Sequence, residues 1–196
     1  MSAGGIRCKT LIIRAPCPLK LLGTRGAPLY AAPGHSDIAM EAELTPEQMT
    51  RLFETHREAE ARRDYDAIID TFTEDCYLET VALGSRSEGR TAARMAYVAY
   101  FTAFPDLRPH DEGMAFGDDV LVTWGHLQGT SRGDWLGVPP SGGTFRVPFT
   151  NVTTFASGRM AGESIYFDLA TLCDQANLPL EQIRAAAKSR TTATPE

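Results

Sequence analysis

Apolar residues recur every three or four positions between Thr45 and about Arg63, so the first ordered segment is predicted to be an amphipathic helix. Thr45 and Gln48 can form a capping box at its start, and Pro46 fits the first helical position. The apolar side of this helix consists of Met49, Leu52, Phe53, His56 and Ala59. His56 is therefore expected on the face that meets the rest of the protein.

Shorter elements are predicted between this helix and residue 105. Asp64 can cap a second helix, and its buried stripe would be Tyr65, Ile68, Ile69 and Phe72. Residues 76–82 are predicted to form a strand. A third helix is expected over residues 92–103, and it must end before Pro105 because the residue preceding a proline is disfavoured in helical conformation.

Long alternating segments follow and predict four strands, over residues 107–116, 120–130, 144–156 and 159–167. Helices are then expected over residues 169–176 and up to about Lys188. Three helices, a run of antiparallel strands and a closing helix indicate an α+β fold. Because so few strands can bury their apolar side only by curling around the helices, we expect a cone with an internal cavity.

The length of 196 residues, 43% of them hydrophobic, suffices for one sizeable core. We expect one domain over residues 44–178, followed by a short helix and tail over residues 179–196. Residues 1–43 are interpreted as a leader or extension. They would be a disordered tail, sequence upstream of a true start at Met40, or an organelle transit peptide.

Charge and cysteine content exclude several classes of protein. The first 36 residues carry five Lys or Arg and no acid, so the remainder is more acidic than the net charge of −6 indicates. This acidic part of the chain repels the phosphate backbone of nucleic acids. No apolar run is long enough to span a membrane. Cys76 and Cys173 stand alone in apolar surroundings, which favours core positions in a reducing, cytoplasmic compartment over a disulfide or zinc site.

Several motifs have an order and spacing found together in one family. They are FPDL at residues 104–107, GT at 129–130, GDWLGVPPSG at 133–142, GRM at 158–160, YFDL at 166–169 and Gln175. From about Thr45 to Leu178 the chain resembles the SnoaL-like polyketide cyclases of the nuclear transport factor 2-like superfamily. The resemblance implies a cone-shaped fold, a hydrophobic small-molecule partner, a homodimer, and neither a metal nor an organic cofactor.

Asp168 matches the aspartate that serves these cyclases as general acid/base in an aldol condensation. A carboxylic acid in an apolar cavity has a raised pKa, and it can both take and return a proton. The alternative is that Asp168 caps the following helix. Alternation places Tyr166 on the same strand face as Asp168, and Glu163 on the other face.

Further candidates surround this predicted site. Trp124 and His126 share one face of the strand over residues 120–130, where His126 would assist proton transfer or polarise a carbonyl. Tyr166 would hydrogen-bond a substrate oxygen, and Trp135 would close the mouth of the cavity. The alternatives are a surface or core histidine, a packed tyrosine and a loop anchor.

The roles of Asn151 and His56 remain open. Members of the family commonly carry a histidine on the strand before the last, where this chain has Asn151 instead, so Asn151 or His126 would replace it. His56 would line the cavity or belong to the core. Arg108 and Arg146 are interpreted as solvated strand arginines.

Three functions therefore remain possible from the sequence. The first is a cofactor-independent enzyme that cyclises or isomerises a carbonyl-rich hydrophobic molecule, and an Asp168→Asn variant with wild-type turnover would argue against it. The second is a non-catalytic binding or dimerisation module. The third is a hydrolase or dehydratase of a small epoxide or alcohol, which requires a second acid or an arginine facing the first acid.

Overall fold

The computed structural model describes residues 10–12 and 43–191, and the predicted leader otherwise lies outside these residues. Its helices are α1 (Pro46–Arg62), α2 (Tyr65–Asp70), the 3₁₀ turn η1 (Val81–Leu83), α3 (Gly89–Ala103), α4 (Leu169–Gln175) and α5 (Leu180–Thr191). Its strands are β1 (Thr10–Ile12), β2 (Phe72–Thr80), β3 (Ser85–Glu88), β4 (Arg108–Phe116), β5 (Val120–Thr130), β6 (Thr144–Ala156) and β7 (Arg159–Phe167). No helix within these ranges is long and apolar enough to cross a membrane.

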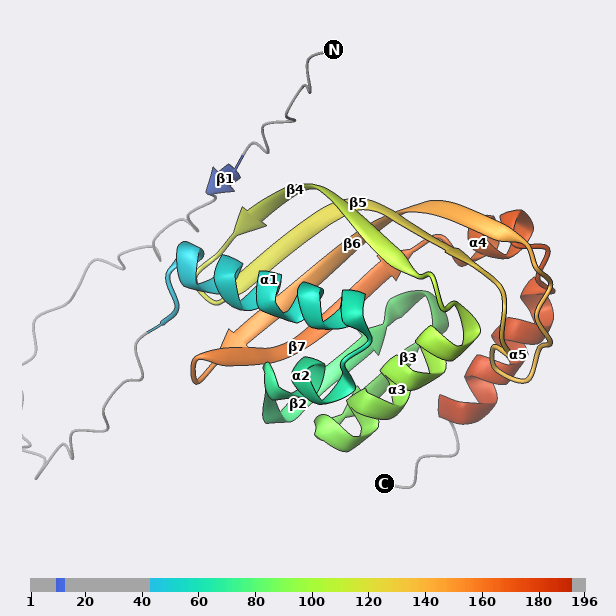
Figure 1. Cartoon of the computed structure of the whole chain (residues 1–196), viewed down its shortest axis with the longest axis horizontal. Helices are drawn as coiled ribbons and strands as arrows, with labels where there is room; N and C mark the ends of the chain where they lie inside the picture. Colours follow the sequence, from blue (N-terminus) through green and yellow to red (C-terminus); the bar gives the residue numbers. More distant parts are fainter. Residues whose placement is uncertain (1–9, 13–42, 192–196) are drawn as a thin grey trace, which may run out of the picture.

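The strands form a single sheet in the order β1-β4-β5-β6-β7-β2-β3. The β4-β5-β6-β7 part is antiparallel, while β2 pairs with β7 in parallel. Register shifts interrupt the β4–β5, β6–β7 and β2–β7 pairings. Such irregularities bend strands and increase their twist, so the sheet curves around the helices. Figure 1 shows α1, α2 and α3 against one face of this curved sheet, with α4 and α5 at one end.

The hydrophobic core consists of two clusters. One joins α1, α2 and α3 to β2 through residues such as Phe53, Phe72 and Phe101. The other joins the ends of β6 and α3 to α4 and α5 through residues such as Phe104 and Leu172. Cys76 and Cys173 are buried free thiols in these clusters, and burial raises the pKa of both.

The expected fold class is confirmed, and several boundaries match in detail. Thr45 forms the capping box with Gln48, and the bounds of β5, β6 and β7 are those predicted. The short hairpin partner β3 was not predicted, because its sequence SRSE has no apolar residue to generate alternation. Phe72 begins strand β2 and does not belong to the second helix.

Candidate active site

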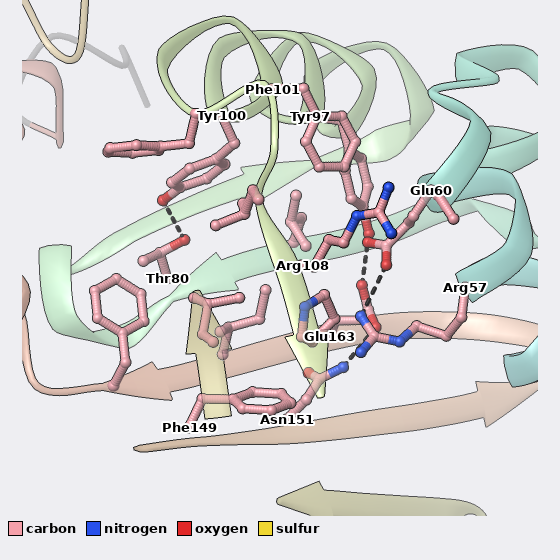
Figure 2. A pocket seen from close by; sticks show the side chains of 18 of the residues that line it. Arg57, Glu60, Thr80, Tyr97, Tyr100, Phe101, Arg108, Phe149, Asn151 and Glu163 are labelled. Carbon is pink, nitrogen blue, oxygen red and sulfur yellow. Dashed lines mark hydrogen bonds and ion pairs between the residues drawn. The ribbon is translucent and has the colours of Figure 1, made fainter. Parts of the chain in front are cut away.

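A cavity of about 340 Å³ lies where the two core clusters meet. Helices α1, α3 and α4, strands β2 and β4–β7, and the loop that carries Trp135 all contribute to its wall. Figure 2 shows that its polar side chains gather at one end, around Glu163, Glu60 and Arg57. The pair Tyr100 and Thr80 lies at the other end, among aromatic rings.

The strand face that lines the cavity is the one that carries Glu163. On β7 the lining residues are Glu163, Ile165 and Phe167, and on β6 they include Phe149 and Asn151. The expectation that the face of Tyr166 and Asp168 points inward is therefore wrong. The alternation of the strand was correct, but alternation alone does not state which of the two faces is covered by helices.

Asp168 lies outside the cavity lining and is exposed. Its carboxylate caps α4, accepting hydrogen bonds from the Ala170 and Thr171 amides at 2.9 and 3.2 Å and from the Thr171 hydroxyl at 2.5 Å. These hydrogen bonds, the hydroxyl first, lower the pKa of Asp168. A carboxylate held in its charged form at the surface lacks the environment that the acid/base role requires.

We therefore expect Asp168 to matter for stability. Asp168→Ala removes the acceptor of two helix amides and should lower the thermal midpoint of unfolding, because the first amides of a helix lack partners within the helix. Asp168→Asn retains a capping oxygen and should lower it less. Thermal unfolding followed by circular dichroism measures both variants. Equal midpoints for wild type and Asp168→Ala would contradict the capping role.

Three of the other predicted residues lie on the outer face of the sheet, and none of them lines the cavity. Trp124 and Tyr166 are 39% and 44% exposed, respectively. Trp124 packs on Gly113 of β4, where a side chain larger than hydrogen would collide with the indole ring. His126 is partly exposed and its Nδ1 lies 2.5 Å from Glu112 Oε1. The prediction that these three residues line the cavity is therefore wrong.

Trp135 and Asn151 do line the cavity, as predicted. Trp135 is 3% exposed and packs edge-on against Phe104, with ring centroids 5.1 Å apart. It belongs to the apolar end of the wall, to which Phe145, Phe149, Phe167 and Leu172 also contribute. Tyr100 adds one polar group there. Its hydroxyl donates to Thr80 Oγ1 at 2.7 Å, and burial raises the pKa of Tyr100 to about 12.

Glu163 is the buried acid of the cavity and is 2% exposed. The hydroxyl of Tyr97 donates to Glu163 Oε2 at 2.6 Å, and the Asn151 amide donates to Oε1 at 2.6 Å. Both carboxylate oxygens therefore accept hydrogen bonds. Burial and the negative charge of Glu163 raise the pKa of Tyr97 well above its ordinary value, so the phenol remains protonated.

A second acid, Glu60, lies beside Glu163 and is paired with Arg57. Arg57 donates to Glu60 Oε2 at 2.8 Å and to Asp111 Oδ2 at 3.2 Å. Burial alone would raise the pKa of Glu60, but the charge of Arg57 and the contact with His56 outweigh burial and lower it to about 2. Glu60 is therefore a permanent anion at neutral pH. In Figure 2 Arg57, Glu60 and Arg108 lie at the same end of the cavity as Glu163.

His56 lies directly behind this polar end, fully buried, and does not line the cavity. Its Nε2 lies 3.6 Å from Glu60 Oε1 and 3.7 Å from Glu163 Oε2. Burial opposes the charged imidazolium, but the two carboxylates, Glu163 first, overcome this effect and raise the pKa of His56. His56 is thus a core residue, which was one of the two open alternatives.

His56, Glu60 and Glu163 could together offer three ligand atoms within 4.8 Å of one another. Glu60 Oε2 and both carboxylate oxygens of Glu163 are already engaged, however, by the Arg57 guanidinium, the Tyr97 hydroxyl and the Asn151 amide. A cation at this point would compete with Arg57 for Glu60. We therefore interpret the group as an ion-pair cluster and assign no metal to it.

The central acid was missed although the sequence contained a signal for it. Glu163 is the one charged residue within the sequence MAGESIYF, and it is flanked on its own strand face by Ile165 and Phe167. An acid in such an apolar context is rarely buried without a function or a partner. His56 and Glu60 are four residues apart on one helix, and this spacing was a second signal that the sequence contained.

Comparison with known proteins identifies the family. Residues 50–176 match the model of the SnoaL-like polyketide cyclases, and the chain belongs to this family. No curated protein matches the chain.

Solved structures with the same fold were also found, and three illustrate it. A SnoaL-like polyketide cyclase family protein from Jannaschia sp. CCS1 is 23% identical, with a TM-score of 0.62, over 74% of this chain and 99% of that one. TsrD from Streptomyces laurentii is 21% identical, with a TM-score of 0.60, over 70% and 100%. A protein with a ketosteroid isomerase-like fold from Catenulispora acidiphila is 17% identical, with a TM-score of 0.57, over 70% and 98%. At these identities the likeness shows the fold alone.

Proposed function

We propose that the protein is a cyclase-like enzyme that transfers protons on a hydrophobic, carbonyl-rich small molecule, with Glu163 as general acid/base. The observation that carries this proposal is a carboxylate 2% exposed, on the wall of a largely apolar cavity of about 340 Å³. A buried acid with access to a substrate-sized space can remove a proton from a carbon beside a carbonyl. Glu163 takes the role that the sequence suggested for Asp168.

The residues around Glu163 have distinct tasks in this proposal. Glu163 removes a proton from the carbon beside the carbonyl, which breaks the C–H bond and leaves an enolate. Arg108, at the exposed rim of the cavity, offers positive charge to the enolate oxygen. The Oδ1 atom of Asn151 is buried without a hydrogen-bond partner among the described residues, so it can accept a hydrogen bond from a substrate hydroxyl.

The shape of the cavity indicates the kind of substrate. Aromatic side chains at one end suit a flat ring system, and the acid at the other end suits a carbonyl carried by that ring system. An aldol-type cyclisation or an isomerisation needs this combination. Native mass spectrometry of the purified full-length protein should therefore reveal a co-purifying ring-bearing carbonyl compound. A charged, ring-free compound retained in its place would argue against this substrate class.

An epoxide hydrolase or dehydratase is the second candidate, and one observation favours it. Arg57 donates to both Glu60 and Asp111, and this acid–arginine–acid set lines the same cavity. Such a set could orient a water molecule for attack on an epoxide. Styrene oxide, as a probe, separates the two candidates. Formation of its diol, lost in Asp111→Asn and retained in Glu163→Gln, would favour the hydrolase.

We further propose that the protein forms a homodimer through the outer face of the sheet, where Trp124 and Tyr166 are exposed. Pairing places these residues on either side of Thr150, so they form one row across three strands. Exposed aromatic residues grouped in this way are typical of interfaces. The outer face could also serve a non-catalytic module, so the dimer alone does not decide the function.

Analytical ultracentrifugation tests this interface. The wild type should sediment as a dimer, and Trp124→Glu should shift it to the monomer by placing a charge in a desolvated contact. Met95→Glu, on the exposed side of α3 where Met95 is 68% exposed, is the matched control and should leave the dimer intact. A monomeric wild type, or a dimeric Trp124→Glu variant, would contradict the proposal.

A further inference from the structure

His56, Tyr97 and Glu163 form a continuous hydrogen-bonded chain from the core to the cavity. The Nε2 atom of His56 lies 3.1 Å from the Tyr97 oxygen, and the Tyr97 hydroxyl donates to Glu163 Oε2 at 2.6 Å. His56 and Tyr97 are buried. Of the three residues, Tyr97 and Glu163 line the cavity and His56 does not. The three residues come from α1, α3 and β7, so the chain exists only in the folded protein.

Counting the protons of the neighbouring groups shows the state of His56. Thr71 has one hydroxyl proton, which it donates to the Ile68 carbonyl at 2.6 Å. Its oxygen, 2.8 Å from His56 Nδ1, must therefore accept a proton from that nitrogen. Tyr97 also has one proton. When Glu163 is a carboxylate, Tyr97 donates this proton to it, so the Tyr97 oxygen accepts from His56 Nε2. In this state both ring nitrogens carry protons, and His56 is an imidazolium.

We propose that Tyr97 is the bridge of a proton relay through which the buried His56 controls the protonation state of Glu163. In the transfer, the His56 Nε2–H bond breaks as its proton passes to the Tyr97 oxygen. The original Tyr97 O–H bond breaks as that proton passes to Glu163 Oε2. The imidazolium and carboxylate thereby become a neutral imidazole and a carboxylic acid, with no change in the total charge.

The surroundings of His56 are compatible with both states. The titratable or charged groups that face it are Glu60 and Arg57 from α1, Tyr97 from α3 and Glu163 from β7. Thr71, after α2, holds Nδ1, and the ring of Phe72 from β2 packs edge-on at 5.2 Å. His56 Nε2 lies 3.1 Å from the Tyr97 oxygen and 3.6 Å from Glu60 Oε1, so its hydrogen bond goes to Tyr97, which leads on to Glu163.

This inference rests on the proposed function of Glu163 and extends it. As a carboxylate, Glu163 can remove a proton from carbon. As a carboxylic acid supplied through Tyr97, it can donate a proton inside the cavity without taking one from water. Tyr97 and His56 are thus positioning residues that act through Glu163. The relay would give one side chain both roles that an aldol-type reaction requires.

The proton positions can be measured without a substrate, by NMR of full-length protein with ¹⁵N-labelled histidine. At neutral pH both ring nitrogens of His56 should be protonated, and Glu163→Gln should lower its titration midpoint because it removes a negative charge. Tyr97→Phe should expose the Nε2 proton to faster solvent exchange. Tyr77→Phe is the matched control: this tyrosine lies on β2, outside the cavity lining, and its hydroxyl is 3.3 Å from Thr154 Oγ1.

The relay also predicts a kinetic signature for the bicyclic ketone 2-tetralone, whose α-protons exchange with deuterium from D₂O through the enolate. Tyr97→Phe should slow exchange at least about 10-fold and change its pH profile, whereas Tyr77→Phe should do neither. Equal thermal midpoints would show that both variants are folded.

The two proposals fail in different ways. A singly protonated His56 ring in the wild type, or an Nε2 proton unaffected by Tyr97→Phe, overturns the relay whatever the exchange rates are. Exchange that is insensitive to Glu163→Gln, together with the expected NMR results, overturns only the catalytic role of Glu163.

Discussion

Replacing Glu163 with glutamine should reduce proton exchange of 2-tetralone in D₂O by about 100- to 10,000-fold, the range typical for loss of a general base. Glutamine has almost the same shape and can still accept from Tyr97, so the change removes basicity and leaves the cavity wall in place. Exchange is followed by the loss of the α-proton signals of the ketone in NMR spectra.

The matched control for this variant is Asp168→Asn. It makes the same carboxylate-to-amide change at the acid that the sequence favoured, but on an exposed side chain outside the cavity. We expect it to exchange the probe at the wild-type rate. The opposite pattern, with Asp168→Asn inactive and Glu163→Gln active, would restore Asp168 as the reactive acid and contradict our assignment.

Replacing His56 with phenylalanine should cause the largest loss of stability, about 3–5 kcal/mol in the free energy of unfolding at pH 6. His56 is completely buried, and its charge compensates Glu163 and Glu60, whose oxygens lie 3.7 and 3.6 Å away. Phenylalanine fills the space but leaves buried negative charge without this partner. It also leaves the hydroxyl oxygen of Thr71 without the proton that His56 donates.

This loss should depend on pH in a defined direction. The pKa of His56 is raised in the folded protein, so its contribution is fully present below the ordinary value of 6.5. The contribution disappears as the pH rises through the folded-state pKa. The difference between wild type and His56→Phe should therefore be large at pH 6 and smaller in alkaline solution. Urea unfolding at several pH values measures it.

Glu60 defines the acid side of this profile. Its pKa is lowered from 4.5 to about 2, so its contribution is present above 4.5 and is lost as the pH falls toward about 2. The ion-pair cluster should thus stabilise the protein most between about pH 4.5 and 6.5. His126→Phe is the control, because the His126–Glu112 pair is partly exposed and its loss should cost little. Equal destabilisation by His56→Phe and His126→Phe would contradict a charged His56.

Much of the fold was predictable because local signals and tertiary structure agree. The capping box at Thr45 starts α1 without help from the rest of the protein, and strict alternation sets the bounds of β5, β6 and β7. The hairpin strand β3 was missed because the sequence SRSE is polar throughout. It forms at the sheet edge, where pairing with β2 and not burial decides its conformation.

The site was predictable only in part. Trp135 and Asn151 were identified, because Trp135 lies in a family motif and Asn151 lies on the strand where the family commonly carries a histidine. Asp168, Tyr166, Trp124 and His126 were assigned to the wrong side of the sheet. A strand sequence separates its residues into two sets, but the helices that pack on one face determine which set is inside.

The sequence by itself determined the order of the long helices and strands, the α+β class, the family and the two sets of residues on each long strand, because these depend on spacing and local hydrogen bonding. Only the tertiary structure decided that Glu163 is the buried acid. It also decided that Asp168 is a cap and that His56 Nε2 lies 3.7 Å from Glu163 Oε2. The reason is physical: these pairs join residues from different elements, and their pKa values depend on the burial and charges that folding creates.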